Sequence, residues 1–199
     1  MQQLVFYGTV WDLFMVKNLY AYDLYRFYGR KESYLERLTR PPELRYLYWK
    51  RKWESSKSRF IKLFCTVRLR RLSHRTQIQI PKRTQIGKGF YIGHSGIVII
   101  NERAIIGENV NVATGVTIGQ ENRGPRKGVP IIGNRVWIGT NSVIVGKITI
   151  GNDVLIAPLT FVNFDVPDHS IVVGHPAKII PRKDAVKDYI TKTTEEMTK

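Results

Sequence analysis

From Ile86 to Val162 an aliphatic residue recurs at every sixth position, with one two-residue slip and one loop, and a small residue usually follows it. Ile86-Gly87, Ile106-Gly107 and Ile132-Gly133 are examples. A period of six fits neither a helix nor the alternation of one long strand. It is typical of a solenoid in which each hexapeptide forms one short strand and a corner, and three hexapeptides complete a triangular coil. The repeat predicts a mainly-β chain folded as a β-helix, with aliphatic side chains inside the prism and small residues at its corners.

Three segments of different composition surround and include this repeat. Residues 1–75 are basic and aromatic and are expected to form two or three helices, with Pro41-Pro42 separating a helix around Leu13 to Tyr28 from the next one. Residues 76–182 hold the β-helix, and a loop rich in Gly, Pro and charge at 120–130 interrupts its phase. Residues 183–199 are expected to form a short C-terminal helix or frayed tail, whose amphipathic part runs from Asp184 to Met197.

Positive charge is concentrated in the N-terminal segment. The formal net charge is +16, and residues 1–75 carry 17 Lys and Arg against 6 Asp and Glu. Two interpretations stay open: a solvated helical face, or a patch for the anionic inner surface of a membrane or a substrate linked to a lipid phosphate. Nucleic acid is not expected as a partner, because no recognised binding motif accompanies the charge.

The chain shows no sign of export or of a membrane span. No apolar run reaches the roughly 18 residues that a spanning helix needs, and no signal-peptide pattern opens the sequence. The single cysteine, Cys65, cannot form an intrachain disulfide and is expected to be a small apolar filler. The sequence therefore predicts a cytoplasmic protein, with attachment to the inner membrane surface left open.

One histidine stands out within the repeat. His94, in Gly93-His94-Ser95-Gly96, lies beside small residues, so it is expected at a corner facing a groove and not inside the prism. A surface or structural role is the alternative. An imidazole with an ordinary pKa near 6.5 can take a proton from an alcohol as a new bond forms. No Gly-x-Ser-x-Gly elbow is present, so no covalent acyl-enzyme is expected.

These residues resemble a known family. Gly93 to Ile99, Val116 to Gly119 and the stretch Asp165 to Lys178 are similar to the serine O-acetyltransferase branch of the left-handed β-helix acyltransferases, over about residues 78–182. The resemblance implies a left-handed parallel β-helix, acetyl-CoA as co-substrate, no metal, and a homotrimer with grooves between its subunits. It also implies that His94 removes a proton from the acceptor hydroxyl, whose oxygen attacks the thioester directly.

Three departures from that branch shape the expected acceptor. Gln79 stands where the serine enzymes have an aspartate that orients the histidine, Gly93 where they have an aspartate that holds the amino acid, and Val129 where they have a second histidine. Each lost charge-assisted contact costs about 1.5–3 kcal/mol. We therefore expect the acceptor to be a sugar or polysaccharide precursor, as in relatives that acetylate capsule or exopolysaccharide sugars.

Other functions remain as alternatives. The first is serine O-acetylation in cysteine biosynthesis, and the second is a non-catalytic scaffold. A zinc carbonic anhydrase on the same fold is disfavoured, because the remaining histidines (His74, His169 and His175) lack the spacing of metal ligands.

Further site residues follow from spacing and from the resemblance. Glu102, Gln79 or a main-chain carbonyl is expected to orient His94, because an imidazole base needs a partner on its other nitrogen. Acceptor-binding candidates are Gln79 and, in the loop, Arg123, Arg126 and Lys127, for which a solvated loop is the alternative. The resemblance places coenzyme A against Thr140, Pro158, Asn163, Lys178 and Arg182.

Overall fold

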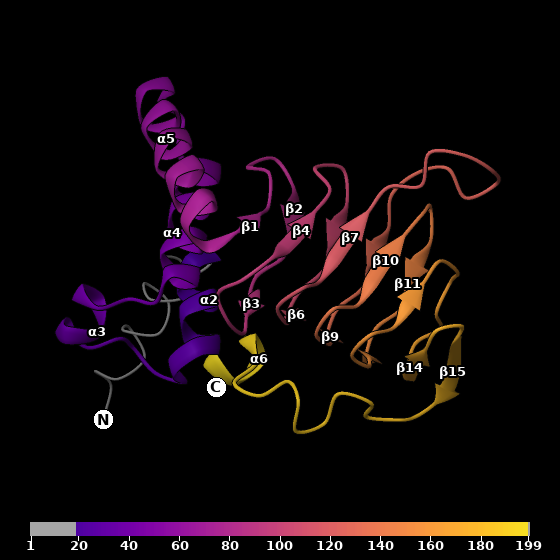
Figure 1. Cartoon of the computed structure of the whole chain (residues 1–199). Coiled ribbons are helices and arrows are strands. Elements are labelled where there is room, and N and C mark those ends of the chain that lie inside the picture. The colour runs from indigo at the N-terminus through magenta and orange to yellow at the C-terminus, as the bar shows by residue number, and fades with distance from the viewer. Residues whose placement is uncertain (1–18, 199) are drawn as a thin grey trace, which may run out of the picture.

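The computed structural model describes residues 19–198 and shows a β-helix with helices packed at its N-terminal end (Figure 1). In the described part, the helices before the strands are α2 (Leu19–Tyr28), α3 (Tyr34–Leu38), α4 (Pro42–Ser55) and α5 (Arg59–Thr76). The expected break at Pro41-Pro42 is confirmed, since α4 begins at Pro42 and proline is well tolerated in a first helical turn. The predicted start of the first helix, around Leu13, lies outside the described residues.

Three sheets form the faces of the prism, and the repeat visits them in turn. Sheet A contains β1 (Ile78–Gln79), β4 (Val98–Ile100), β7 (Thr117–Gly119), β10 (Val143–Val145) and β13 (Phe161–Val162). Sheet B contains β2 (Gln85–Ile86), β5 (Ile105–Ile106), β8 (Ile131–Ile132) and β11 (Thr149–Ile150). Sheet C contains β3 (Tyr91–Ile92), β6 (Asn111–Val112), β9 (Val136–Ile138), β12 (Val154–Ile156), β14 (Ser170–Gly174) and β15 (Ala177–Pro181).

Each strand pairs in parallel with the strand one coil away, and only β15 turns back antiparallel to β14 among the described strands. The chain passes from sheet A to B to C and back to A, so the prism has three edges. We call them the AB, BC and CA corners. The predicted solenoid of hexapeptide repeats is confirmed.

The repeated aliphatic residues fill the prism as expected. Ile92, Ile118, Ile138 and Ile150 are fully buried and belong to one continuous apolar cluster. Burying a side chain of this size contributes roughly 1.5–3 kcal/mol. The core therefore follows directly from the six-residue period.

The glycines after these residues have a more specific role than turning the chain. Gly87, Gly107, Gly133 and Gly151 stack at the BC corner of successive coils, and none has a left-handed φ. A Cβ at Gly87 would lie 2.6 Å from the carbonyl oxygen of Gly107, and one at Gly133 would lie 2.6 Å from that of Gly151. These glycines are required because adjacent coils approach closely there.

A buried ion pair joins the helices to the first coil. Arg51 on α4 donates to both carboxylate oxygens of Asp23 on α2, at 2.8 and 3.2 Å, and both side chains are almost completely buried. Asp23 also accepts from the backbone N–H of Phe90 (2.9 Å), and Arg51 donates to the carbonyls of Ile86 and Gly87. Some of the charged side chains that were expected on a solvated helical face are therefore buried.

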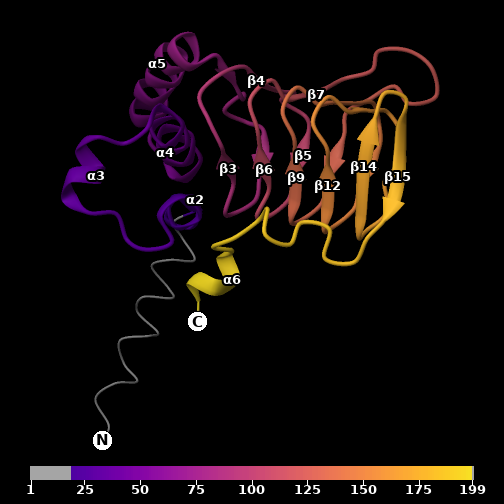
Figure 2. The ribbon, with the colours of Figure 1, turned by 60° about the horizontal axis from the view of Figure 1, so that its bottom comes forward.

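The expected short C-terminal helix is present, and it follows an irregular tail. Figures 1 and 2 show the C-terminal segment returning from β15 along the outside of the β-helix to α2, and only α6 (Thr194–Met197) is helical. Left-handed residues at Asp184, Asp188 and Lys192 interrupt any longer helix. Tertiary contacts explain the path, because the apolar residues of the segment pack on sheet C around Leu155, namely Ala185, Val186 and Ile190.

Two further expectations concern Cys65 and membrane spans. Cys65 is fully buried and free, as expected for an apolar filler. Among residues 19–198, no helix combines the length and the apolar character that crossing a bilayer would need.

Candidate active site

His94 lies at the CA corner of the first coil, between β3 and β4, and its side chain is exposed. The loop that carries it is fastened on both sides. The N–H of Gly93 donates to the carbonyl of Val112 (3.0 Å), and the N–H of Gly96 donates to the carbonyl of Thr76 (3.1 Å) at the end of α5. His94 is therefore presented from a rigid corner, as the sequence predicts.

A contact that sequence reasoning missed ties this corner to α4. The hydroxyl of Ser95 donates to the carboxylate of Glu43, which is buried in the first turn of α4. The positive end of a helix dipole stabilises a carboxylate at such a position. Within residues 19–198 no side chain hydrogen-bonds to the His94 ring itself, so the Ser95–Glu43 pair holds the loop and not the imidazole.

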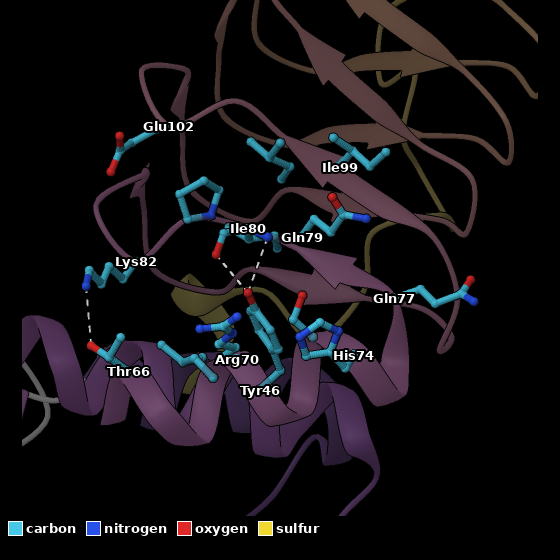
Figure 3. A pocket seen from close by; sticks show the side chains of 14 residues that line it. Tyr46, Thr66, Arg70, His74, Gln77, Gln79, Ile80, Lys82, Ile99 and Glu102 are labelled. Atoms are coloured by element: carbon cyan, nitrogen blue, oxygen red, sulfur yellow. Dashed lines mark hydrogen bonds between the residues drawn. The ribbon is translucent and has the colours of Figure 1, made fainter. Parts of the chain in front are cut away.

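A groove of about 750 Å³ runs between α5 and the outer face of sheet A (Figure 3). Its lining includes Gln79, Glu102 and three basic side chains, Arg70, His74 and Lys82. Figure 3 shows Glu102 and Lys82 at one end and His74 with Gln77 at the other. The latter end borders the His94 loop, because Val98 N–H donates to the carbonyl of Gln77.

Tyr46 forms the floor of this groove. Its hydroxyl donates to the carbonyl of Ile80 (2.8 Å) and accepts from the N–H of the same residue (3.2 Å), as the dashed lines in Figure 3 show. Burial raises the pKa of Tyr46 to about 12, so the phenol stays neutral. The groove therefore has a fixed, uncharged floor.

The structure does not bring Glu102 to His94 within one chain. Glu102 lies at the AB corner, after β4, whereas His94 lies at the CA corner before that strand. Gln79 also lies along sheet A, paired with Ile99, and not at the His94 corner. Neither Glu102 nor Gln79 is therefore placed to orient His94 within one chain. Strand β4 separates Glu102 from the His94 corner, and Gln79 lies on β1.

The three loop residues that are predicted to bind the acceptor lie at the AB corner instead. The loop 120–130 leaves sheet A after β7 and projects from this edge (Figure 1). Glu121 and Gly128 bridge its base, and Arg103 donates to Gln120 beneath it. The exposed loop residues Arg123, Arg126 and Lys127 thus share one edge of the prism with Lys82 and Glu102.

The predicted cofactor residues lie on later coils. Thr140 and Pro158 occupy the CA corner of successive coils, the same edge as His94, and Leu159 N–H donates to the carbonyl of Thr140 (2.9 Å). Asn163 follows β13, while Lys178 is exposed on β15 and Arg182 directly follows that strand. His94 and the first two cofactor candidates therefore line one continuous edge.

Comparisons with known proteins agree with this architecture. The family model described as bacterial transferase hexapeptide (six repeats) matches residues 130–163. A solved serine acetyltransferase from Neisseria gonorrhoeae is 27% identical with a TM-score of 0.69, over 85% of this chain and 67% of that one. A serine acetyltransferase from Brucella abortus in complex with coenzyme A is 26% identical with a TM-score of 0.69, over 83% and 67% of the two chains.

Curated relatives are of the same kind. Serine acetyltransferase 4 of Arabidopsis thaliana is 37% identical over 55% of this chain and 31% of its own length. The serine acetyltransferase of Helicobacter pylori is 37% identical over 54% of this chain and 63% of its own length. The chain is a hexapeptide-repeat protein similar to the serine O-acetyltransferases. It covers less than two thirds of either curated relative.

The sugar acceptor expected from the sequence is a wrong prediction. The relatives and solved structures named above are all serine acetyltransferases. The error lay in treating Gln79, Gly93 and Val129 as the loss of every charged partner. The fold brings other charges, Glu43 beside the His94 loop and Glu102 with Lys82 at the AB corner, and no spacing in the sequence indicates the contact of Glu43.

No metal site accompanies these residues. Among the described residues, no three His, Cys, Asp or Glu side chains come together as a metal would need.

Proposed function

We propose that this protein is an acetyl-CoA-dependent O-acetyltransferase that acetylates the hydroxyl of serine. The observation that carries the proposal is the exposed His94 at a fixed corner of a β-helix that is similar to serine acetyltransferases along most of its length. The scaffold alternative provides no reason for such a histidine. This chemistry requires a basic group beside the acceptor hydroxyl, and an imidazole suits that role.

His94 acts as the general base in this proposal. Its neutral ring nitrogen takes the proton of the serine hydroxyl while the oxygen attacks the thioester carbonyl carbon of acetyl-CoA. The tetrahedral intermediate then expels the coenzyme A sulfur, which takes up the proton from the imidazolium. Serine leaves as its O-acetyl ester, and no acyl-enzyme forms. The Ser95–Glu43 contact keeps the corner, and with it the base, in place.

Coenzyme A extends from His94 along the CA corner in this proposal. Thr140 and Pro158 lie along that edge, and Pro158 offers only a carbonyl because it has no N–H. Lys178 and Arg182 supply cations near the end of the β-helix, where phosphates would need them. One related structure holds coenzyme A, which supports the same co-substrate here.

We propose a homotrimer in which two subunits complete each site. The CA and AB corners flank sheet A, so three prisms that turn sheet A toward a common axis bring the CA corner of one against the AB corner of the next. His94 of one subunit would then face Glu102, Lys82 and the loop residue Arg126 of its neighbour. Glu102 suits the ammonium of serine and the cations suit its carboxylate.

The acceptor is tested by following thiol release from acetyl-CoA with L-serine, O-methylserine and the methyl ester of serine. We expect turnover with L-serine, none with O-methylserine, which has no free hydroxyl, and a raised KM with the ester, which lacks the carboxylate. Absence of serine-dependent release by the wild-type protein would overturn the acceptor assignment.

Shared sites are tested by subunit complementation. His94→Ala and Glu102→Gln subunits, each impaired alone, should regain activity when co-expressed, because some sites then combine an intact His94 with an intact Glu102. The control is co-expression of His94→Ala with a second His94→Ala subunit carrying a different tag. Mixed assemblies no more active than the control would show that sites are not shared in this way.

A cytoplasmic location, which the free Cys65 fits, is part of the proposal.

A further inference from the structure

The outer face of α5 carries an apolar stripe that is largely exposed. Phe60, Leu63, Phe64 and Val67 follow the i, i+3, i+4, i+7 spacing of one helical face. They are 86%, 65%, 55% and 43% exposed, whereas Cys65 on the opposite face is fully buried. Phe64 meets the ring of Trp49 on α4 edge-on, with 5.4 Å between the ring centroids. Helix α5 thus buries one apolar face against α4 and β1 and leaves most of a second apolar face exposed.

The charges around this stripe have a single sign. Helix α5 contains no acidic residue. Arg71 lies on the stripe itself, four residues after Val67, and Arg68 and Arg75 border it by helical spacing. Arg68 also lies over the ring of Trp49 at 5.3 Å, which adds an aromatic ring to this surface.

We propose that this face of α5 docks on an anionic lipid surface. Apolar side chains bordered by cations and aromatic rings are the composition that binds at the interface of acidic membranes, with the apolar side chains entering the acyl boundary. A second copy of this chain is a poorer partner, because it carries the same uncompensated charge, with a net +16 overall. Figure 1 shows α5 at the end of the molecule away from the late coils, so docking leaves the AB and CA corners free.

A second exposed apolar surface in the same molecule provides a matched control. Tyr34 and Leu35 on α3 are 76% and 72% exposed, comparable with Phe60 and Leu63. Four basic residues lie around them, Arg30, Lys31, Arg37 and Arg40, and two of these pair with Glu36 and Glu32. This surface therefore carries a smaller excess of positive charge than α5, which has six basic residues and no acidic one. Exposure alone would make the two surfaces equivalent, whereas lipid docking distinguishes them.

The test is co-sedimentation of the full chain with vesicles of phosphatidylcholine alone or mixed with phosphatidylglycerol, at low and high salt. We expect binding to the mixed vesicles only, weakening as the Debye length shrinks from about 10 Å at 0.1 M salt to about 3 Å at 1 M. Each interfacial cation is expected to change partitioning by about fivefold, so Arg68→Gln/Arg71→Gln should lower it by roughly 25-fold.

The apolar part is tested by Phe60→Ser/Leu63→Ser, which should lower partitioning at least about tenfold, while Tyr34→Ser/Leu35→Ser should leave it unchanged. Equal binding to both vesicle types, or equal effects of the two Ser pairs, would overturn the proposal. A loss of oligomers in Phe60→Ser/Leu63→Ser on analytical ultracentrifugation would also overturn it, by showing an interface between copies. The proposed acetyl transfer is measured by thiol release without vesicles, so it can succeed or fail independently of lipid docking.

Discussion

Removing the carboxylate of Asp23 should destabilise the whole chain, because it takes away the fully buried counter-charge of a buried guanidinium. Asp23 is fully buried, and it accepts two hydrogen bonds from Arg51 and one from the N–H of Phe90. In Asp23→Ala, Arg51 keeps the carbonyls of Ile86 and Gly87 and only the partly exposed carboxylate of Glu54 (3.1 Å). Breaking one partner of a buried pair costs about 3–5 kcal/mol.

Urea unfolding followed by tryptophan fluorescence measures this loss directly. For a chain of this size, 3–5 kcal/mol corresponds to a fall in Tm of roughly 6–20 °C. The matched control is Glu108→Gln, which breaks the exposed pair of Lys88 and Glu108 (3.4 Å) and should cost less than about 1 kcal/mol. An Asp23→Leu/Arg51→Met double variant should recover part of the loss, because no lone charge remains buried.

Two outcomes would refute this reasoning. The first is an Asp23→Ala protein that folds and loses less than about 1 kcal/mol of unfolding free energy. The pair of Asp23 and Arg51 would then contribute no more than an exposed ion pair. The second is a double variant less stable than the single one by several kcal/mol, which would mean that the pair stabilises the fold by more than its desolvation cost.

Three further predictions concern the corners and the helices. Gly107→Ala should destabilise the β-helix by at least about 1–3 kcal/mol in urea unfolding, because its Cβ would meet the carbonyl of Gly133 in the next coil; an unchanged midpoint would contradict the close-approach explanation. Ser95→Ala should lower kcat with little change in KM for acetyl-CoA, because it frees the His94 loop from Glu43, and Ser95→Thr should restore part of the rate. Equal kcat in the wild-type protein and both variants would show that Ser95 does not position His94. Hydrogen bonds from Arg30, the largest cause, and from Ser33 lower the pKa of Glu36 from 4.5 to about 2, so these contacts stabilise α3 fully above about pH 4.5 and are lost as the pH falls towards 2; in Arg30→Gln, NMR titration should show that pKa rising part of the way to its ordinary value.

The sequence predicts the β-helix well because each coil requires the same residue types at the same positions. Each aliphatic residue of the period lies inside the prism, and Gly87, Gly107 and Gly133 at the BC corner each meet the glycine of the next coil. Local spacing alone therefore fixes strands, corners and core. The start of α4 is also marked locally, by Pro42.

Contacts between distant segments could not be predicted in the same way. Glu43 and Ser95 are 52 residues apart, and Asp23 and Phe90 are 67 apart. No period connects them, because the first of each pair lies on a helix whose docking angle the sequence does not encode locally. The same limit explains Glu102, whose eight-residue distance from His94 suggests proximity although β4 separates the corners.

The path of the C-terminal tail before α6 could not be predicted, for a related reason. Its composition favours a helix from Asp184 onwards, yet Val186 and Ile190 gain more by packing on sheet C than a short isolated helix would gain by itself. Asp153 further accepts from the N–H groups of Ala185 and Val186, which holds the tail against the BC corner.

The role of His94 is tested most directly by the kcat of acetyl transfer from acetyl-CoA to L-serine, compared between the wild-type protein, His94→Ala and the control His169→Asn. His169 is a suitable control because it lies at the BC corner and has a left-handed φ that asparagine tolerates. We expect serine-dependent transfer by the wild-type and His169→Asn proteins, and a kcat at least about a hundredfold lower in His94→Ala, as for loss of a general base. Wild-type kcat in a folded His94→Ala protein would contradict this account.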